Sequence, residues 1–228
     1  MAKLSKVSAF VSAMQEIHKN WDKLSVDDRQ QSLQNAINNS FPEELPEVEL
    51  NISDLDVHTM GQMDPSTFSI DVNKNLFEGT MTDEKFIKLS NTLYHEGRHI
   101  EQFFSAAQWK ASQGDTPEDI QVEMGLPESI ANAAANNPAP SNSPESHMGE
   151  SVFHSVYGDR SEYRNDVYET LDNTPQIEDF DSKEEFNAAV ELYDISIDQY
   201  YALPEETDAF SSGDEAERKM KKALSPSK

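Results

Sequence analysis

The sequence predicts an α+β protein that is mainly helical, with a small antiparallel sheet beside one long helix. Residues 82–112 repeat apolar side chains at helical spacing, with Leu89, Leu93 and Ile100 on one side. Residues 47–58 instead alternate apolar and polar side chains, which is typical of a strand with one buried face. Most other segments between prolines and glycines have helical periodicity, so helices dominate the expected fold.

The chain is expected to form one domain over residues 1–228. The predicted helices are 4–23, 26–39, 82–112, 117–124, 127–135, 146–173, 182–200 and one that begins after Pro204. The predicted strands are 47–58 and 67–72, joined by a turn over 60–65. The domain would then consist of N-terminal helices (1–40), the sheet and long helix (47–112), a helical part (113–211) and a tail that frays (212–228).

The pattern H-E-x-x-H lies inside the long predicted helix, as His95, Glu96, Gly97, Arg98 and His99. Positions i and i+4 of a helix project from one face, so the two histidines can hold one metal ion together. Glu96 is rotated by about 100° along the helix, so it lies beside the metal and can act as a general base. Zinc is the expected ion, one per chain, because it accepts two imidazoles and a carboxylate and leaves a position for water.

Four residues of this helix, besides the two histidines and Glu96, have predicted roles. Gln102 is two turns beyond His95 and returns to the histidine face, where it can hydrogen-bond a ligand or the substrate; a solvent-facing glutamine is the alternative. Arg98 and Glu101 are expected to form a surface ion pair. Gly97 costs about 1 kcal/mol relative to alanine inside a helix, and close approach by another backbone would account for it.

The third metal ligand must come from another part of the chain. Pro204 suits the first turn of a helix, and the acids that follow suit the positive end of the helix dipole. We predict Glu206 as the ligand, with Asp208 as runner-up and Glu205 third. The alternative is that all three acids only complement the helix N-terminus.

The other histidines are rival ligands or have structural roles. His147 and His154 compete with the acids, because zinc is often held by three imidazoles. The surroundings of His147 indicate a loop entering a helix, which favours an exposed side chain. His18 and His58 have no metal-like spacing to other ligand residues and are predicted to be structural or solvent-facing.

Four segments carry a resemblance to a known group of proteins: residues 21–29, 68–73, the run around the H-E-x-x-H motif, and 203–209. Together they resemble the HExxH metallopeptidase domains of bacterial polymorphic toxins and of contractile-injection or type VI secretion effectors. Only the HExxHxxQ portion is specific. The chain departs from the pattern in having Gly97 where alanine is usual and Phe103 where tryptophan is usual.

The resemblance implies a zincin-like fold, with His95 and His99 as ligands and Glu96 as the base. It also implies a protein or peptide substrate, with a cognate immunity protein or a secretion machinery as partner. The expected activity is zinc-dependent endopeptide hydrolysis. A tyrosine is expected to stabilise the oxyanion, and the candidates are Tyr157, Tyr200 and Tyr201. An extended substrate is expected to pair with a strand beside the metal.

Composition restricts the remaining possibilities. The chain is 36% hydrophobic with eleven Phe, seven Tyr and two Trp, which indicates a folded core, and it has no cysteine for a disulfide or thiolate site. No apolar run is long enough to span a membrane. The serine-broken N-terminus argues against a cleaved signal peptide, so we expect synthesis in the cytoplasm and, by resemblance, delivery into a target cell by a secretion or injection system.

The formal net charge of −25 disfavours binding to nucleic acid. Solubility is the preferred explanation of this charge. The alternative function is a non-catalytic acidic interaction protein, either a DNA mimic or an inactive zincin that acts by binding. Such a protein would keep its partner after chelation and after substitution of Glu96.

Overall fold

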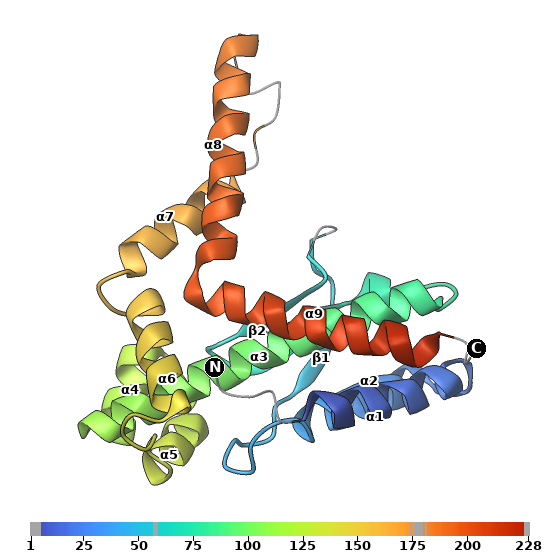
Figure 1. Cartoon of the computed structure of the whole chain (residues 1–228), viewed down its shortest axis with the longest axis horizontal. Helices are drawn as coiled ribbons and strands as arrows, with labels where there is room; N and C mark the ends of the chain where they lie inside the picture. The colour runs from blue at the N-terminus through green and yellow to red at the C-terminus, as the bar shows by residue number, and fades with distance from the viewer. Residues whose placement is uncertain (1–5, 57–58, 174, 176–179, 181, 226–228) are drawn as a thin grey trace.

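The computed structural model describes residues 6–56, 59–173, 175, 180 and 182–225 (Figure 1). The helices are α1 (Val7–Asn20), α2 (Val26–Asn38), α3 (Asp83–Gln113), α4 (Pro117–Met124), α5 (Glu128–Asn136), α6 (Pro144–Val156), α7 (Ser161–Asp172), α8 (Lys183–Ala202) and α9 (Pro204–Leu224). The strands are β1 (Leu50–Ser53), β2 (Gly61–Asp64) and β3 (Ser69–Asn73). The predicted class, α+β and mainly helical with a small sheet, is confirmed.

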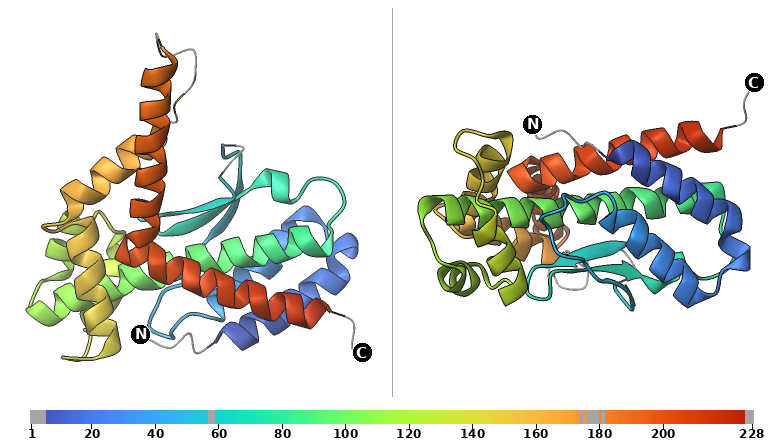
Figure 2. Two further views of the ribbon diagram at one scale, coloured as in Figure 1. Left: turned by 45° about the horizontal axis from the view of Figure 1, so that its top comes forward. Right: turned by 90° about the horizontal axis from the view of Figure 1, so that it is seen from below.

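Helix α3 lies at the centre of the arrangement, with other elements on several sides of it (Figure 2). Thr82 caps its start by accepting a hydrogen bond from the Lys85 N–H, and Gly114 ends it at a φ of 103°. Every residue from 92 to 100 is buried. A helix that is buried all round needs partners all round, and α9, α6, α5 and strand β2 are among the elements that pack against it.

Helix α9 runs along α3 in the opposite direction. Gln102 of α3 bonds the Glu205 carbonyl near the start of α9, whereas Asn91 bonds Glu217 near its end. Residues 212–224, where the sequence predicted a fraying tail, continue this helix, because Ala216 and Met220 are buried in the core. The start of α9 is therefore fixed against the middle of α3.

The sheet has the order β1–β3–β2 and is mixed rather than antiparallel. β1 pairs with β3 in parallel and β2 pairs with β3 in antiparallel register, so the predicted antiparallel sheet was wrong. The predicted turn over 60–65 was also wrong, since Gly61–Asp64 is strand β2. The Asn73 side chain donates hydrogen bonds to the carbonyls of Leu55, Asp56 and Thr59. These bonds hold the connection that returns the chain across β3, and sequence alternation alone does not report such a connection.

The single helix expected over 146–173 is two helices, α6 and α7. The break follows Tyr157 and contains Gly158, and the Ser161 hydroxyl donates to the Gly158 carbonyl at the start of α7. The chain bends here, so α7 lies against α8, which projects from the rest of the molecule (Figure 1). None of the helices in the described ranges is both long and apolar enough to cross a membrane.

Candidate metal centre

Helix α3 brings His95 and His99 together on one face, as their spacing predicted. Their Nε2 atoms are 3.1 Å apart, and each residue is only 8% exposed. The ring of His95 also packs edge-on against Phe210 of α9, with ring centroids 4.5 Å apart. Two imidazole nitrogens therefore converge on one point at the contact between α3 and α9.

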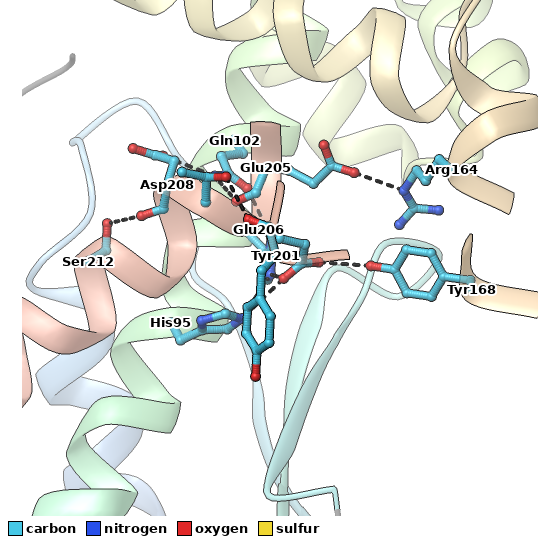
Figure 3. Close-up of polar contacts among 11 residues, drawn as sticks. His95, Gln102, Arg164, Tyr168, Tyr201, Glu205, Glu206, Asp208 and Ser212 are labelled. Carbon is cyan, nitrogen blue, oxygen red and sulfur yellow. Dashed lines mark hydrogen bonds and ion pairs between the residues drawn. The ribbon is translucent and has the colours of Figure 1, made fainter. Parts of the chain in front are cut away.

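Glu206 meets this point from the first turn of α9. Its Oε2 lies 3.7 Å from Nε2 of His95 and 3.5 Å from Nε2 of His99. Its Oε1 accepts a hydrogen bond of 2.8 Å from the Tyr168 hydroxyl (Figure 3). Oε2 is buried and, apart from these two ion-pair distances, has no hydrogen-bond partner in the described part of the chain. A buried carboxylate oxygen without a donor is costly, and a bound cation would remove that cost.

The three donor atoms have the separations that a tetrahedral metal requires. Two ligand atoms about 2.0–2.1 Å from zinc lie about 3.3 Å apart, and the observed distances are 3.1, 3.5 and 3.7 Å. His95, Glu96 and His99 also form a buried group whose potential ligand atoms lie within 4.8 Å of one another. Glu206 is not a member of that group, but its Oε2 pairs with both imidazoles at 3.7 and 3.5 Å, whereas no such pair joins Glu96 to either imidazole within the described residues, so Glu206 fits the third ligand position better.

Gln102 holds His99 in the orientation that a metal ligand needs. Its Nε2 donates to the Glu205 carbonyl at 2.8 Å and to Asp208 Oδ2 at 2.9 Å, so its Oε1 faces Nδ1 of His99 at 2.9 Å. The amide orientation assigned from this network makes Nδ1 the N–H donor and leaves Nε2 for a metal. The sequence-based interpretation of Gln102 as a partner of the ligands is thus consistent with its position, and the solvent-facing alternative is wrong because Gln102 is fully buried.

Asp208, the runner-up ligand, binds Arg98 instead. Arg98 Nε donates to its Oδ2 at 2.6 Å, and Nη1 of Arg98 donates to Glu101 at 2.7 Å. The expected pair of Arg98 and Glu101 exists, but it was wrongly predicted to be a surface pair, since the Arg98 side chain is 4% exposed. Arg98 also lines a separate cavity of about 450 Å³, and neither His95 nor His99 lines this second cavity.

Burial and neighbouring charges shift the pKa values of the three donor groups in different directions. Burial lowers the pKa of His95 to about 4, and the charge on His99 acts in the same direction. Burial acts to lower the pKa of His99 as well, but Glu206 raises it overall. Burial acts to raise the pKa of Glu206, yet His99 and the Tyr168 hydroxyl hold it well below its usual range.

Glu96 lies beside the donor atoms in a different environment. Burial raises its pKa to about 7, while the charge on His99 and a hydrogen bond from the Met63 backbone of β2 partly oppose the shift. A carboxylate with a pKa near neutrality can accept and return a proton at physiological pH.

A cavity of about 430 Å³ lies over this group of residues. Strand β2 forms one wall through Gly61, Gln62 and Met63, and α7 contributes Arg164 and Tyr168. His95, Glu96, His99 and Glu206 all line this cavity, so the candidate metal site lies at its wall.

The three predicted oxyanion tyrosines have different surroundings. Tyr200 lines the cavity, and burial together with the charge of Glu206 raises its pKa. Tyr201 is 51% exposed and packs on Phe210, whereas Tyr157 packs on Phe103, and neither of these tyrosines lines the cavity. Tyr200 is therefore the one of the three that is placed to meet a ligand.

The rival histidines lie elsewhere. His147 and His154 line a different surface pocket, and Nδ1 of His154 is 3.0 Å from Asp159 Oδ1. His18 lies 3.3 Å from Asp83, away from the candidate metal ligands. His58 lies outside the described residues.

Gly97 has a different neighbour from the one expected. A Cβ at this position would lie 2.6 Å from Cδ1 of Ile37 and 3.5 Å from Cε1 of Phe41. The close approach is thus made by side chains, not by another backbone, and the buried side chain of Ile37 occupies the space that an alanine would need.

Sequence reasoning missed Arg164 and Tyr168, which α7 brings to the cavity. The Arg164 guanidinium lies 4.3 Å from the Tyr168 ring centroid, and its Nε donates to Glu205 Oε1 at 2.9 Å. Their i, i+4 spacing was visible, but it indicates only that they share a helix face. Nothing in the sequence showed that this face meets α9.

No protein-family model, curated protein or solved structure matches the chain. The functional interpretation therefore depends on the geometry of the site and on the motif that the sequence contains.

Proposed function

We propose that this protein is a zincin-like zinc metalloendopeptidase whose zinc ligands are His95, His99 and Glu206. The observation that carries the proposal is the convergence of two imidazole nitrogens and an otherwise unpartnered carboxylate oxygen at separations of 3.1, 3.5 and 3.7 Å. Two imidazoles and one carboxylate are a donor set that catalytic zinc uses with one position left open.

Zinc held by these atoms would supply Lewis acidity for the scissile carbonyl and for the attacking water. Glu96 accepts the proton of that water and returns it to the leaving amine, a role supported by its burial and its raised pKa. Tyr200 lines the same cavity and is the best placed tyrosine to donate a hydrogen bond to the developing oxyanion.

Strand β2 offers a way to hold the substrate. It is an edge of the described sheet and three of its residues line the cavity. An extended peptide can add to such an edge through main-chain hydrogen bonds, which places its backbone beside Glu96. From the resemblance of its motif segments, we propose that the protein is related to the HExxH peptidases of toxins and injection effectors.

The test is cleavage of an unfolded protein substrate by the purified, zinc-supplemented chain. We expect cleavage that stops on chelation and returns with zinc. Glu96→Gln should bind zinc and keep the fold but lose turnover, because it removes the base and retains the side-chain shape. An active, zinc-loaded Glu96→Gln protein would refute the mechanism, and a partner bound equally well with chelator would favour the acidic interaction protein.

A further inference from the structure

Arg164 is a cationic group that faces the cavity beside the candidate metal ligands. It belongs to the first turns of α7 and lines the same cavity as His95 and Glu96. It is the one arginine or lysine among the residues described as lining that cavity. A ligand that reaches the three donor atoms therefore passes close to one positive side chain.

The orientation of Arg164 is fixed by two contacts. Its Nε donates to Glu205 Oε1 at 2.9 Å, and its guanidinium carbon lies 4.3 Å from the Tyr168 ring centroid. Figure 3 shows Nε of Arg164 directed toward Glu205 and its two Nη atoms on the side of Tyr168. Within the described residues, neither Nη atom makes a hydrogen bond, and the ion pair of Arg164 with Glu205 runs through Nε.

A guanidinium held in this way presents a free pair of N–H donors. Two parallel N–H groups of a guanidinium have the spacing to donate to the two oxygens of one carboxylate. Because stacking and the bond to Glu205 already fix the plane, little conformational entropy remains to be lost when a ligand binds.

The acidic residues of the cavity raise the opposite possibility, a basic ligand. Glu205 Oε2 is buried without a hydrogen-bond partner in the described part of the chain. However, the Glu205 side chain is 1% exposed, whereas that of Arg164 is 20% exposed. An incoming group therefore meets Arg164 first. Asp172 also lines the cavity but is exposed at the end of α7, where solvent weakens its attraction for a cation.

We propose that Arg164 binds a carboxylate of the peptide substrate, so that the protein selects substrates with this group near the scissile bond. The carboxylate is either an acidic side chain or the free C-terminus of the peptide. This inference rests on the proposed peptidase function and specifies its substrate class.

The experiment begins with a synthetic peptide library that contains all residue types and both free and amidated C-termini. Cleavage by the zinc-loaded full chain, mapped by mass spectrometry, identifies the preferred position. Peptide pairs then compare Glu with Gln at that position, or a free with an amidated C-terminus. A charge-assisted hydrogen bond predicts a kcat/KM about tenfold to a hundredfold higher for the member with the carboxylate.

Arg164→Gln should reduce this ratio to near unity. Arg160→Gln is the matched control, because it makes the same charge change on an exposed side chain at the start of α7 and should keep the ratio. Arg164→Lys keeps the charge but loses the planar pair of donors, so its ratio should fall between the two. Zinc content and circular dichroism establish that each variant is folded.

Binding of the same library to zinc-loaded Glu96→Gln protein separates the two proposals. Carboxylate-dependent binding without cleavage by the wild type would contradict the peptidase function and support the role of Arg164. Cleavage without a carboxylate preference, a preference for lysine or arginine, or a ratio unchanged in Arg164→Gln would overturn the inference. Absence of carboxylate-dependent binding would overturn it as well.

Discussion

Replacement of Gln102 by leucine should weaken both the fold and metal binding. The substitution keeps a similar volume but removes the partner of His99 Nδ1 and of the Glu205 carbonyl, while Asp208 keeps its bond to Arg98. The Glu205 carbonyl lies in the first turn of α9 and keeps its helical bond, so the group left unpaired is His99 Nδ1. One buried unpaired group costs about 1–3 kcal/mol, and the free energy of unfolding should fall by that amount. Loss of the group that orients His99 should lower zinc affinity by about tenfold to a hundredfold.

Urea unfolding in the presence of chelator measures the first effect without the stabilisation that bound zinc adds. A zinc competition titration measures the second. Gln108→Leu is the matched control on the same helix, because the Gln108 side chain makes a single bond of 2.7 Å, to the Asn137 carbonyl. It should cost about 0.5–1.5 kcal/mol and leave zinc affinity unchanged. A Gln102→Leu protein with the stability and zinc affinity of this control would show that Gln102 does not orient His99.

Two further substitutions test the supports of the site. Tyr168→Phe removes the hydroxyl that donates to Glu206 Oε1 at 2.8 Å, so zinc affinity in a competition titration should fall about tenfold or more; unchanged affinity would mean that this bond does not orient the ligand. Gly149→Ala places a Cβ 2.2 Å from the Ser105 carbonyl oxygen, so α6 must move away from α3. Urea unfolding should show a loss of about 1–3 kcal/mol in the free energy of unfolding. Glu150→Ala, on the exposed face of α6, is the control and should not show this loss.

The sequence predicted best what depends on local periodicity. The long helix and the shared face of His95 and His99 follow from spacing along one element, and the structure places α3 within one residue of the predicted limits at each end. The acids after Pro204 were recognised as candidates from their position at a helix start. Which of them faces the histidines depends on how α9 docks on α3, so Glu206 and Asp208 could be ranked only weakly from sequence.

The features that sequence did not predict depend on contacts between distant segments. The parallel pairing of β1 with β3 could not be predicted, because alternation of side chains is the same in both pairing directions. The break between α6 and α7 turns Arg164 and Tyr168 toward α9. These two residues carry no motif, and their position became visible only with the bend of the chain.

Elemental mass spectrometry of the purified wild type, with His95→Ala measured alongside, is the most direct test that His95, His99 and Glu206 hold a zinc ion. We expect one zinc ion per wild-type chain and its loss in the variant, because the substitution removes one of the three donor atoms. Absence of stoichiometric metal from the wild type, or full retention of zinc by His95→Ala, would show that these residues do not form a zinc site.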